Sequence, residues 1–366
     1  MCHVGGVLAV RIVVAIAGAA IVLATLASAL QTVVVPRAKV TRLTWIHFIW
    51  IRQVFNAIAN PRRTFAARDR LFATYAPLAL VTMPFMWLTF VIIGFAFIFW
   101  GTGIDPFGEA LAISGSSMTT LGFERPDGLG REILAVVEAS LGLGLVALLI
   151  SYLPTIYTAF QRRERVVGGL QARMGLPPSP VKMYRRYVSI GWLDRVGDDI
   201  FPLWEGWFVD IEESHTSQPW LVFFRSPQPE RSWITTAGAV LDLAALHNAV
   251  VDLPHDPRAD LFLRAGYLSL RRIADSFGIR YDADPRPDDP ITVTREEFDE
   301  VCAQLIAYDV PLIDDLDQGW RDFAGWRVNY DSVLVALATL VVAPPAPWSS
   351  DRADRALRPT LIRRRR

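Results

Sequence analysis

The stretch that decides the fold runs Asp105-Pro-Phe-Gly-Glu-Ala-Leu-Ala-Ile-Ser-Gly-Ser-Ser-Met-Thr-Thr-Leu-Gly-Phe-Glu124. Asp105 followed by Pro106 is typical of an N-cap and a first helical turn, and the small apolar residues after them predict a short helix over 110–117. Such a helix is too short to cross a bilayer, because a crossing needs about 20 mostly apolar residues. The sequence on both sides decides whether it lies in a surface loop or at membrane depth.

Long apolar stretches flank this segment. Residues 71–104 carry no charged side chain, residues 133–160 carry only Glu138, and residues 12–35 near the N-terminus carry none. Stretches of this length without a polar face are typical of membrane-spanning helices and not of the core helices of soluble proteins. We therefore expect three spans, near 8–35, 75–100 and 132–160. A signal peptide over 1–29 with the cleavage site Ala27-Ser28-Ala29 is the alternative for the first span.

The composition agrees with a membrane protein that also has a water-exposed part. Of the 366 residues, 52% are hydrophobic and 20% are charged, and the formal net charge is zero. This much apolar surface excludes disorder for most of the chain, and the charge balance argues against nucleic acid as a partner. Two cysteines cannot build a disulfide scaffold. Residues 1–170 are net basic and residues 171–366 are net acidic, which separates a basic membrane half from an acidic half.

Charges in the loops predict the orientation. Residues 36–70 contain eight basic side chains, whereas residues 101–132 contain two basic and five acidic ones, and arginines follow the third span. The positive-inside rule then places 36–70 and the C-terminal part in the cytoplasm, and the N-terminus and 101–132 outside the cell. Residues 44–55 are rich in tryptophan and other apolar residues between arginines. They fit an amphipathic helix on the inner leaflet or a helix packed on the cytoplasmic domain.

The end of the quoted stretch resembles a known family. Its residues 119–123, Thr-Thr-Leu-Gly-Phe, resemble the selectivity filter of prokaryotic pore-loop potassium channels, whose pattern is Thr-X-Gly-Tyr/Phe-Gly. The resemblance covers about residues 75–165 and includes the order helix, loop, helix and the external position of the loop. It implies a re-entrant pore helix and an extended filter whose ion-binding residues are Thr119, Thr120, Leu121, Gly122 and Phe123. Ions would bind to the carbonyl oxygens of 120–123 and to the Thr120 hydroxyl.

The way in which K⁺ loses its hydration shell explains what this resemblance implies about ion binding and assembly. Backbone carbonyls replace the hydration shell of K⁺, and four copies of the segment complete each ring of oxygen ligands. The resemblance therefore implies a homotetramer, with K⁺ as the permeant ion and no other cofactor. Non-helical backbone at membrane depth is tolerated only where it is buried in protein or lines water, which a pore satisfies.

One position departs from the family pattern. Glu124 stands where the last filter glycine is expected. A residue with a Cβ adopts a positive φ at a higher energy than glycine does, so we expect the outermost ion site to be distorted. Four copies of Glu124, with Asp127 nearby in sequence, would form an acidic outer mouth that attracts cations. We expect a cation channel that prefers K⁺ but discriminates less sharply than a filter ending in glycine.

The third span, as the pore-lining inner helix of this resemblance, contains three candidate bending points, Gly142, Gly144 and Pro154. Glycines can form a hinge and a proline a kink. Small residues equally allow close packing of helices, and both interpretations stay open.

The C-terminal part is predicted to be helical and carries no readable chemistry. Helical patterns cover 232–251 and 257–277, Thr294-Arg-Glu-Glu297 is a capping box for a helix to about 308, and 331–343 is apolar but too short to span a membrane. No dinucleotide fingerprint and no phosphate-binding loop are present. We therefore expect no enzyme, and the ligand of this domain is left open.

The sequence thus predicts a mainly α protein of the cell membrane with three transmembrane helices, a re-entrant pore helix and a helical cytoplasmic domain. Its parts are an N-terminal span (1–36), a cytoplasmic amphipathic segment (37–74), a pore module (75–165), a cytoplasmic domain (166–345) and a basic disordered tail (346–366). The expected partners are membrane lipid and further copies of the chain. The alternative is a membrane-anchored sensor or regulatory protein with a channel-like fold that does not conduct, and a surface-loop conformation of 106–124 would favour it.

Overall fold

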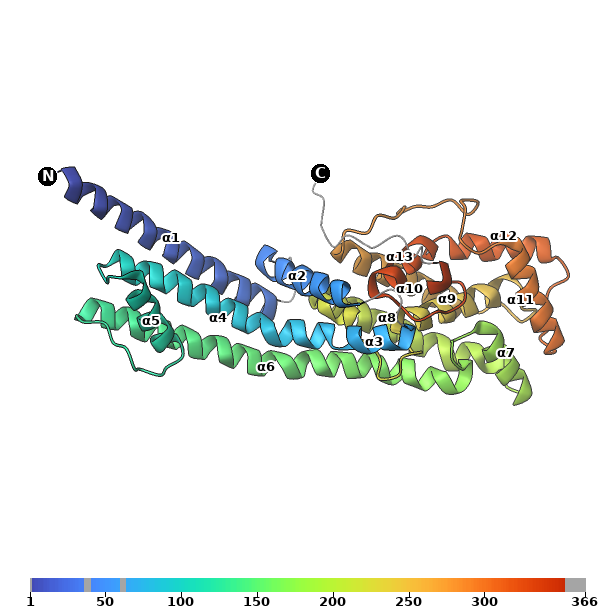
Figure 1. Ribbon diagram of the computed structural model, residues 1–366. Helices are drawn as coiled ribbons and strands as arrows, with labels where there is room; N and C mark the ends of the chain where they lie inside the picture. The colour runs from blue at the N-terminus through green and yellow to red at the C-terminus, as the bar shows by residue number, and fades with distance from the viewer. Residues whose placement is uncertain (1, 36–40, 60–63, 353–366) are drawn as a thin grey trace. The chain divides into compact units, whose positions relative to one another are not determined.

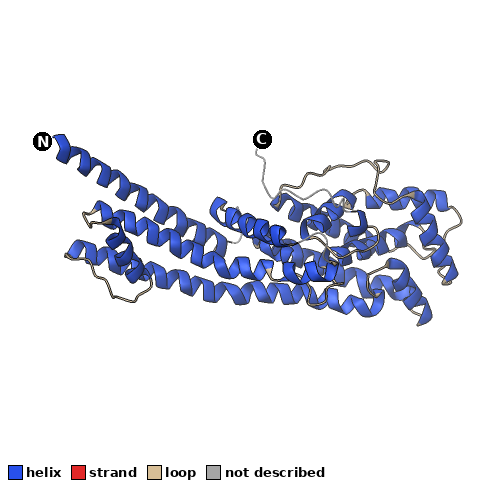
Figure 2. Cartoon of the chain, viewed as in Figure 1, coloured by secondary structure: helices blue, strands red, loops and turns tan. Residues whose placement is uncertain are grey.

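The computed structural model describes residues 2–35, 41–59 and 64–352, with side chains from residue 6 onwards. Within these residues the chain is mainly helical and forms no β-strand (Figure 2), so the predicted mainly α fold is confirmed. Residues 353–366 of the predicted basic tail lie outside the described residues.

Three helical stretches are long and apolar enough to cross a membrane: Gly6–Val33, Phe65–Gly101 and Leu129–Met174. They contain the predicted spans 75–100 and 132–160 and all but the last two residues of the predicted span 8–35. The second stretch combines α3 (Phe65–Ala73) and α4 (Tyr75–Gly101), which are interrupted only at Thr74. The third is α6 (Leu129–Met174), whose 46 residues extend about 69 Å at 1.5 Å per residue. A hydrocarbon core is about 30 Å thick, so α6 is longer than such a layer is thick.

The chain divides into two compact units. The first comprises residues 1–60 and 74–157, and the second comprises residues 61–73 and 158–366. Both α3 and the last part of α6 therefore belong to the second unit, although each continues a helix, or nearly continues one, from the first.

In the first unit, α1 (Cys2–Val33) packs along α4 (Figure 1). The two backbones approach each other at glycines: a Cβ on Gly94 would lie 2.7 Å from Cγ2 of Val22, and one on Gly101 would lie 2.7 Å from the carbonyl oxygen of Arg11. Close approach at small residues is a common basis of helix association in membranes.

The predicted amphipathic segment forms α2 (Arg42–Ile58). Phe48 and Phe55 are buried on the face that packs on α4 and α1, and the Tyr75 hydroxyl donates to the carbonyl oxygen of Phe48 at 3.1 Å. Ile46 and Trp50 are 61% and 65% exposed. Two sides of α2 are therefore apolar, and a single chain covers only one of them.

The second unit is a helical domain around α9 (Trp233–Ala249), which is buried along almost its whole length. Besides α3 and the end of α6, the other described helices of this unit are α7 (Pro180–Ser189), η1 (Leu193–Arg195), α8 (Val196–Ser217), η2 (Pro219–Phe223), α10 (Pro257–Ser276), α11 (Arg295–Ala307), α12 (Leu316–Arg327), α13 (Asp331–Val341) and η3 (Ser350–Arg352). α9 contacts α7, α10, α12 and α13, and α8 packs on α10.

The helices predicted in this region are confirmed, because α9, α10, α11 and α13 begin and end within two residues of the predicted ranges. The predicted capping box at the start of α11 is also present. The side chain of Thr294 accepts from the Glu297 N–H, and the side chain of Glu297 accepts from the Thr294 N–H.

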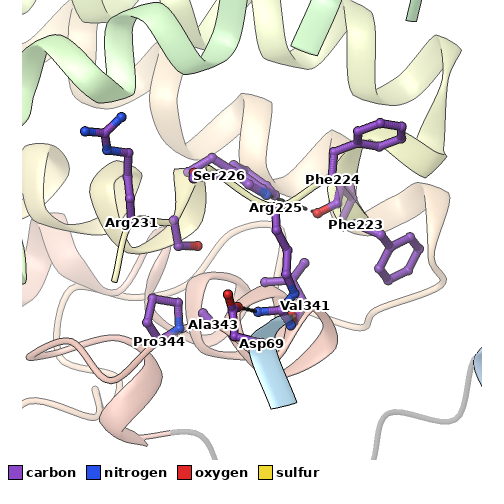
Figure 3. Close-up of a pocket in the computed structure, with 12 residues that line it drawn as sticks. Asp69, Phe223, Phe224, Arg225, Ser226, Arg231, Val341, Ala343 and Pro344 are labelled. Atoms are coloured by element: carbon purple, nitrogen blue, oxygen red, sulfur yellow. Dashed lines mark hydrogen bonds and ion pairs between the residues drawn. The ribbon is translucent and has the colours of Figure 1, made fainter. Parts of the chain in front are cut away.

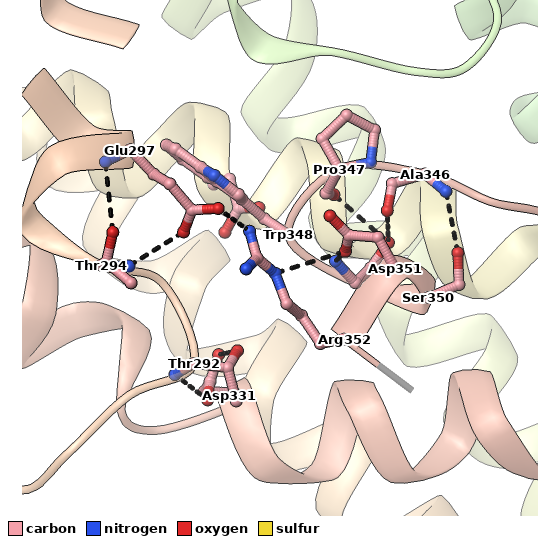
Figure 4. A network of polar contacts seen from close by, with 12 residues as sticks. Thr292, Thr294, Glu297, Asp331, Ala346, Pro347, Trp348, Ser350, Asp351 and Arg352 are labelled. Atoms are coloured by element: carbon pink, nitrogen blue, oxygen red, sulfur yellow. Dashed lines mark hydrogen bonds and ion pairs between the residues drawn. The ribbon is translucent and has the colours of Figure 1, made fainter. Parts of the chain in front are cut away.

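Buried charges in the second unit are paired with one another. Arg327 is fully buried; it forms ion pairs with Asp242 and, at 2.8 Å, with Asp331. It also donates to the carbonyl oxygen of Trp348. Asp331 accepts further bonds from the backbone N–H and the hydroxyl of Thr292, both at 2.8 Å (Figure 4). This network ties α9, α12 and α13 together inside the domain.

Candidate functional site

A short helix, α5 (Phe107–Met118), connects α4 to α6 (Figure 1). It contains the predicted helix and starts three residues earlier. The predicted capping by Asp105 is wrong: Pro106 occupies the cap position without a side-chain bond, and Asp105 forms an ion pair with Arg11 of α1. The local sequence rule failed because a contact with a distant arginine engages the carboxylate.

Side chains on the buried face of α5 hold it between the two long helices. The Ser114 hydroxyl lies 2.9 Å from the carbonyl oxygen of Ile92 on α4 and contacts the carboxyl group of Glu138 on α6. At the end of α5, the carbonyl oxygen of Met118 lies against Gly142 of α6, where a Cβ would overlap it. The helix thus contacts α6 at Glu138 and Gly142. It also packs on α4, through Ser114 and through the ring of Phe107, which lies 5.5 Å from that of Phe97.

In the segment that follows α5, several backbone N–H groups donate hydrogen bonds to that helix. The N–H groups of Leu121 and Gly122 donate to the carbonyl oxygen of Ser116 at 3.0 and 3.4 Å, and the N–H of Glu124 donates to the Ser116 hydroxyl at 3.0 Å. No described residue donates a hydrogen bond to the carbonyl oxygens of residues 119–123.

Two residues of this segment have a left-handed backbone, Thr120 with φ 57° and Gly122 with φ 68°. Glycine adopts this conformation readily, whereas a β-branched residue such as threonine does so only when its surroundings fix it. Left-handed residues at alternate positions interrupt the geometry of a regular strand. The backbone here is therefore more sharply turned than the extended filter that the sequence predicted.

Large apolar side chains are uncovered in this region. Leu121 and Phe123 are 70% and 65% exposed, and Glu124 and Asp127 are exposed beside them in sequence. Exposed apolar residues continue along α6, at Ile133, Val136, Leu143, Val146 and Ile150. Exposed apolar surfaces of this kind mark contacts with other protein chains or with lipid.

The three predicted bending points of α6 differ in their surroundings. Gly142 is packed against the end of α5, whereas a Cβ on Gly144 would meet no atom within 4 Å. Pro154 lies inside α6, which continues through it. Close packing explains the glycine at position 142, and bending at the other two positions stays a prediction.

Sequence reasoning missed the two serines that organise the site, Ser114 and Ser116, because serine is common in short helices and carries no distinctive pattern. Glu138 was visible as the one charged residue in a long apolar stretch. Ionisable residues inside such stretches are rare and usually functional, and that rule could have pointed to its partner on α5.

Two pockets in the second unit are lined partly by charged side chains that already form ion pairs. One is a cavity of about 20 Å³ beside the ion pair of Asp69 and Arg225 (Figure 3). The other is a pocket of about 270 Å³ lined by Glu297, Glu300 and Arg352, among others, and Figure 4 shows Arg352 already engaged with Glu297. The described residues contain no group of three or more histidine, cysteine or acidic side chains that could hold a metal ion.

Comparisons of the chain with protein-family models, with curated proteins and with solved structures find no match.

Proposed function

We propose that the chain is the subunit of a homotetrameric cation channel of the cell membrane that conducts K⁺ in preference to Na⁺. The observation that carries the proposal is the run of carbonyl groups at 119–123, which accept no hydrogen bond from the described residues while the neighbouring N–H groups are bonded to Ser116. Carbonyl oxygens in this state are the ligands that a dehydrated K⁺ requires.

The helices around this segment support the same proposal. α5 has 12 residues and stands between two stretches that are long enough to span a membrane. In the proposed arrangement α4 is the outer helix, α5 the re-entrant pore helix and α6 the inner helix. The partially negative C-terminal end of α5 then favours a cation near Thr119.

A single chain supplies one side of such a pore. Four copies would surround the ions with carbonyl oxygens and would cover the exposed side chains of Leu121 and Phe123. Native mass measurement in detergent should therefore give a tetramer. A strict monomer or dimer would contradict a conducting pore and would favour a membrane-anchored regulatory protein.

The charge pattern of the loops supports a cytoplasmic second unit and an external Glu124. Four copies of Glu124 would concentrate cations at the outer mouth, while the side chain at this position distorts the outermost ion site. The inner sites at 120–123 do not depend on residue 124.

Ion flux into proteoliposomes tests the proposal. We expect K⁺ uptake that exceeds Na⁺ uptake, and we expect Glu124→Gly to raise the ratio of K⁺ to Na⁺ uptake. Glu132→Gln serves as the matched control, because it removes an exposed acid outside the filter and the outer mouth. Absence of flux from all three proteins would contradict the proposal, and equal ratios in all three would show that Glu124 does not set the selectivity.

A further inference from the structure

Glu138 is buried in apolar surroundings without a counter-charge. Its side chain has no exposed surface. Neither α4 nor α5, which pack around it, carries a basic residue, and the only acid on those two helices is Glu109, which is exposed. The Oε2 atom of Glu138 is buried and has no hydrogen-bond partner among the described residues. An ionised carboxylate in this place would carry a large desolvation cost that nothing nearby offsets.

The contacts of Ser114 allow the protons to be counted. Its oxygen lies 2.9 Å from the carbonyl oxygen of Ile92 and is also in hydrogen-bond contact with Oε1 of Glu138. A serine hydroxyl has one proton to donate, and a backbone carbonyl has none. Two hydrogen bonds therefore need a second proton, and the Glu138 carboxyl group is the only member of the set that can supply it.

We propose that Glu138 is a neutral carboxylic acid that positions the pore segment by donating its proton to Ser114, which in turn donates to the carbonyl oxygen of Ile92. This chain of two bonds joins α6, α5 and α4 at one point. Two residues further along α5, Ser116 accepts the N–H groups of Leu121, Gly122 and Glu124. A shift of Ser114 therefore moves the residue to which the filter segment is bonded.

The protonation state is independent of conduction, whereas the positioning role rests on the proposed function. Two experiments test the protonation state and the positioning role of Glu138 separately. The first is infrared spectroscopy of the purified full chain at neutral pH, as the difference between the wild type and Glu138→Gln. We expect the difference spectrum to contain the C=O band of a carboxylic acid, which shifts in Ser114→Ala because that acid loses its hydrogen-bond partner.

Glu132→Gln is the matched control for this measurement. Glu132 lies on the same helix and is exposed, so its difference spectrum should contain the bands of a carboxylate. Carboxylate bands for Glu138 as well would overturn the proposal, whatever the channel does. So would a failure of Glu138→Gln to fold where Glu132→Gln folds, because the amide keeps the size and the donor of a neutral acid.

The second experiment measures the ratio of K⁺ to Na⁺ permeability in bilayers. Glu138→Ala should lower this ratio about tenfold, as expected when one buried hydrogen-bonding group loses its partner. Glu138→Gln should restore most of it, because an amide can donate to Ser114. A conducting wild type with unchanged ratios in both variants would contradict the positioning role alone, and a wild type that conducts no cation would contradict the proposed function and leave the infrared result standing.

Discussion

The two units of this chain bury polar side chains in different ways. In the second unit, buried charges occur as ion pairs, such as Arg327 with Asp242 and Arg225 with Asp69. In the first unit, most buried polar side chains are hydroxyls, such as Ser28 and Thr44, which lie 3.1 Å apart. The one buried acid among the described residues of that unit, Glu138, has no charged partner on α4 or α5.

The exposed surfaces of the two units also differ in how apolar they are. In the first unit, helices α1, α2 and α6 expose many large apolar side chains, including Leu23, Trp50 and Leu143. The second unit exposes fewer of them and carries most of the ion pairs of the described residues. We infer that the second unit is built to be stable in water, whereas the first unit requires lipid or further copies of the chain around it. Each of the following predictions tests what stabilises or covers one of the two units.

The largest effect is expected inside the second unit. Arg327→Met leaves two buried carboxylates, Asp242 and Asp331, without their cation, which should lower the free energy of unfolding by about 3–5 kcal/mol. Hydrogen exchange of the α9 amides measures this loss in the unit itself. Arg321→Met on the exposed side of α12 is the control and should change little. Similar protection in both variants would show that the buried ion pairs do not carry the stability of this unit.

In the first unit, two glycines two residues apart should behave differently. Gly142→Ala places a Cβ against the backbone oxygen of Met118 and should cost about 1–3 kcal/mol, the usual range for overpacking. Gly144→Ala meets no atom within 4 Å, and should stabilise α6 by up to about 1 kcal/mol because alanine favours helices. Thermal unfolding in detergent compares the two. Equal losses would indicate that position 144 is also packed, for instance against another chain.

Acid should weaken the second unit through His215. Burial, and then the positive charge of Arg163, hold the pKa of His215 well below its usual value. The unfolded chain therefore binds the proton more tightly, so stability falls as the pH drops below about 6.5, by at most about 1.4 kcal/mol per pH unit. Melting temperatures measured against pH should fall less steeply for His215→Gln. Parallel slopes in the wild type and in His215→Gln would exclude His215 as the cause.

The smallest effect concerns the uncovered side of α2. Trp50 is 65% exposed, whereas Trp87 of α4 is 1% exposed. If lipid covers the first unit, brominated lipid should quench Trp50, so Trp50→Phe should remove more of the total quenching than Trp87→Phe. The fold should be unaffected, because Trp50 contributes little buried area. Equal quenching losses would place α2 away from lipid.

Much of the helical framework could be predicted from the sequence, because its signals are local. Runs without charge marked the three long apolar helices, and the residues from Thr294 to Glu297 marked the start of α11. The failures have a common physical cause. Asp105 pairs with Arg11, and Glu138 pairs with Ser114, across separations of 94 and 24 residues. The packing of distant segments determines which residues become partners, and no local sequence pattern indicates it.

The same limit applies to the candidate site. The filter-like residues 119–123 stand out in the sequence through their resemblance to a known family. Ser114 does not stand out, because its role comes from the approach of α5 to α4 and α6. Ser116 does not stand out either, because its bonds to residues 121–124 follow no recognised sequence pattern. The buried network around Arg327 was invisible for the same reason, since its members come from three different helices.

The measurement that tests the central claim most directly is the reversal potential of the purified full chain in a planar bilayer, with K⁺ on one side and Na⁺ on the other and chloride on both. We expect a cation current whose reversal potential lies on the K⁺-selective side of zero and moves further in that direction for Glu124→Gly. A current that reverses at the chloride potential, or no current from either protein, would contradict the claim that residues 119–123 form a cation pore.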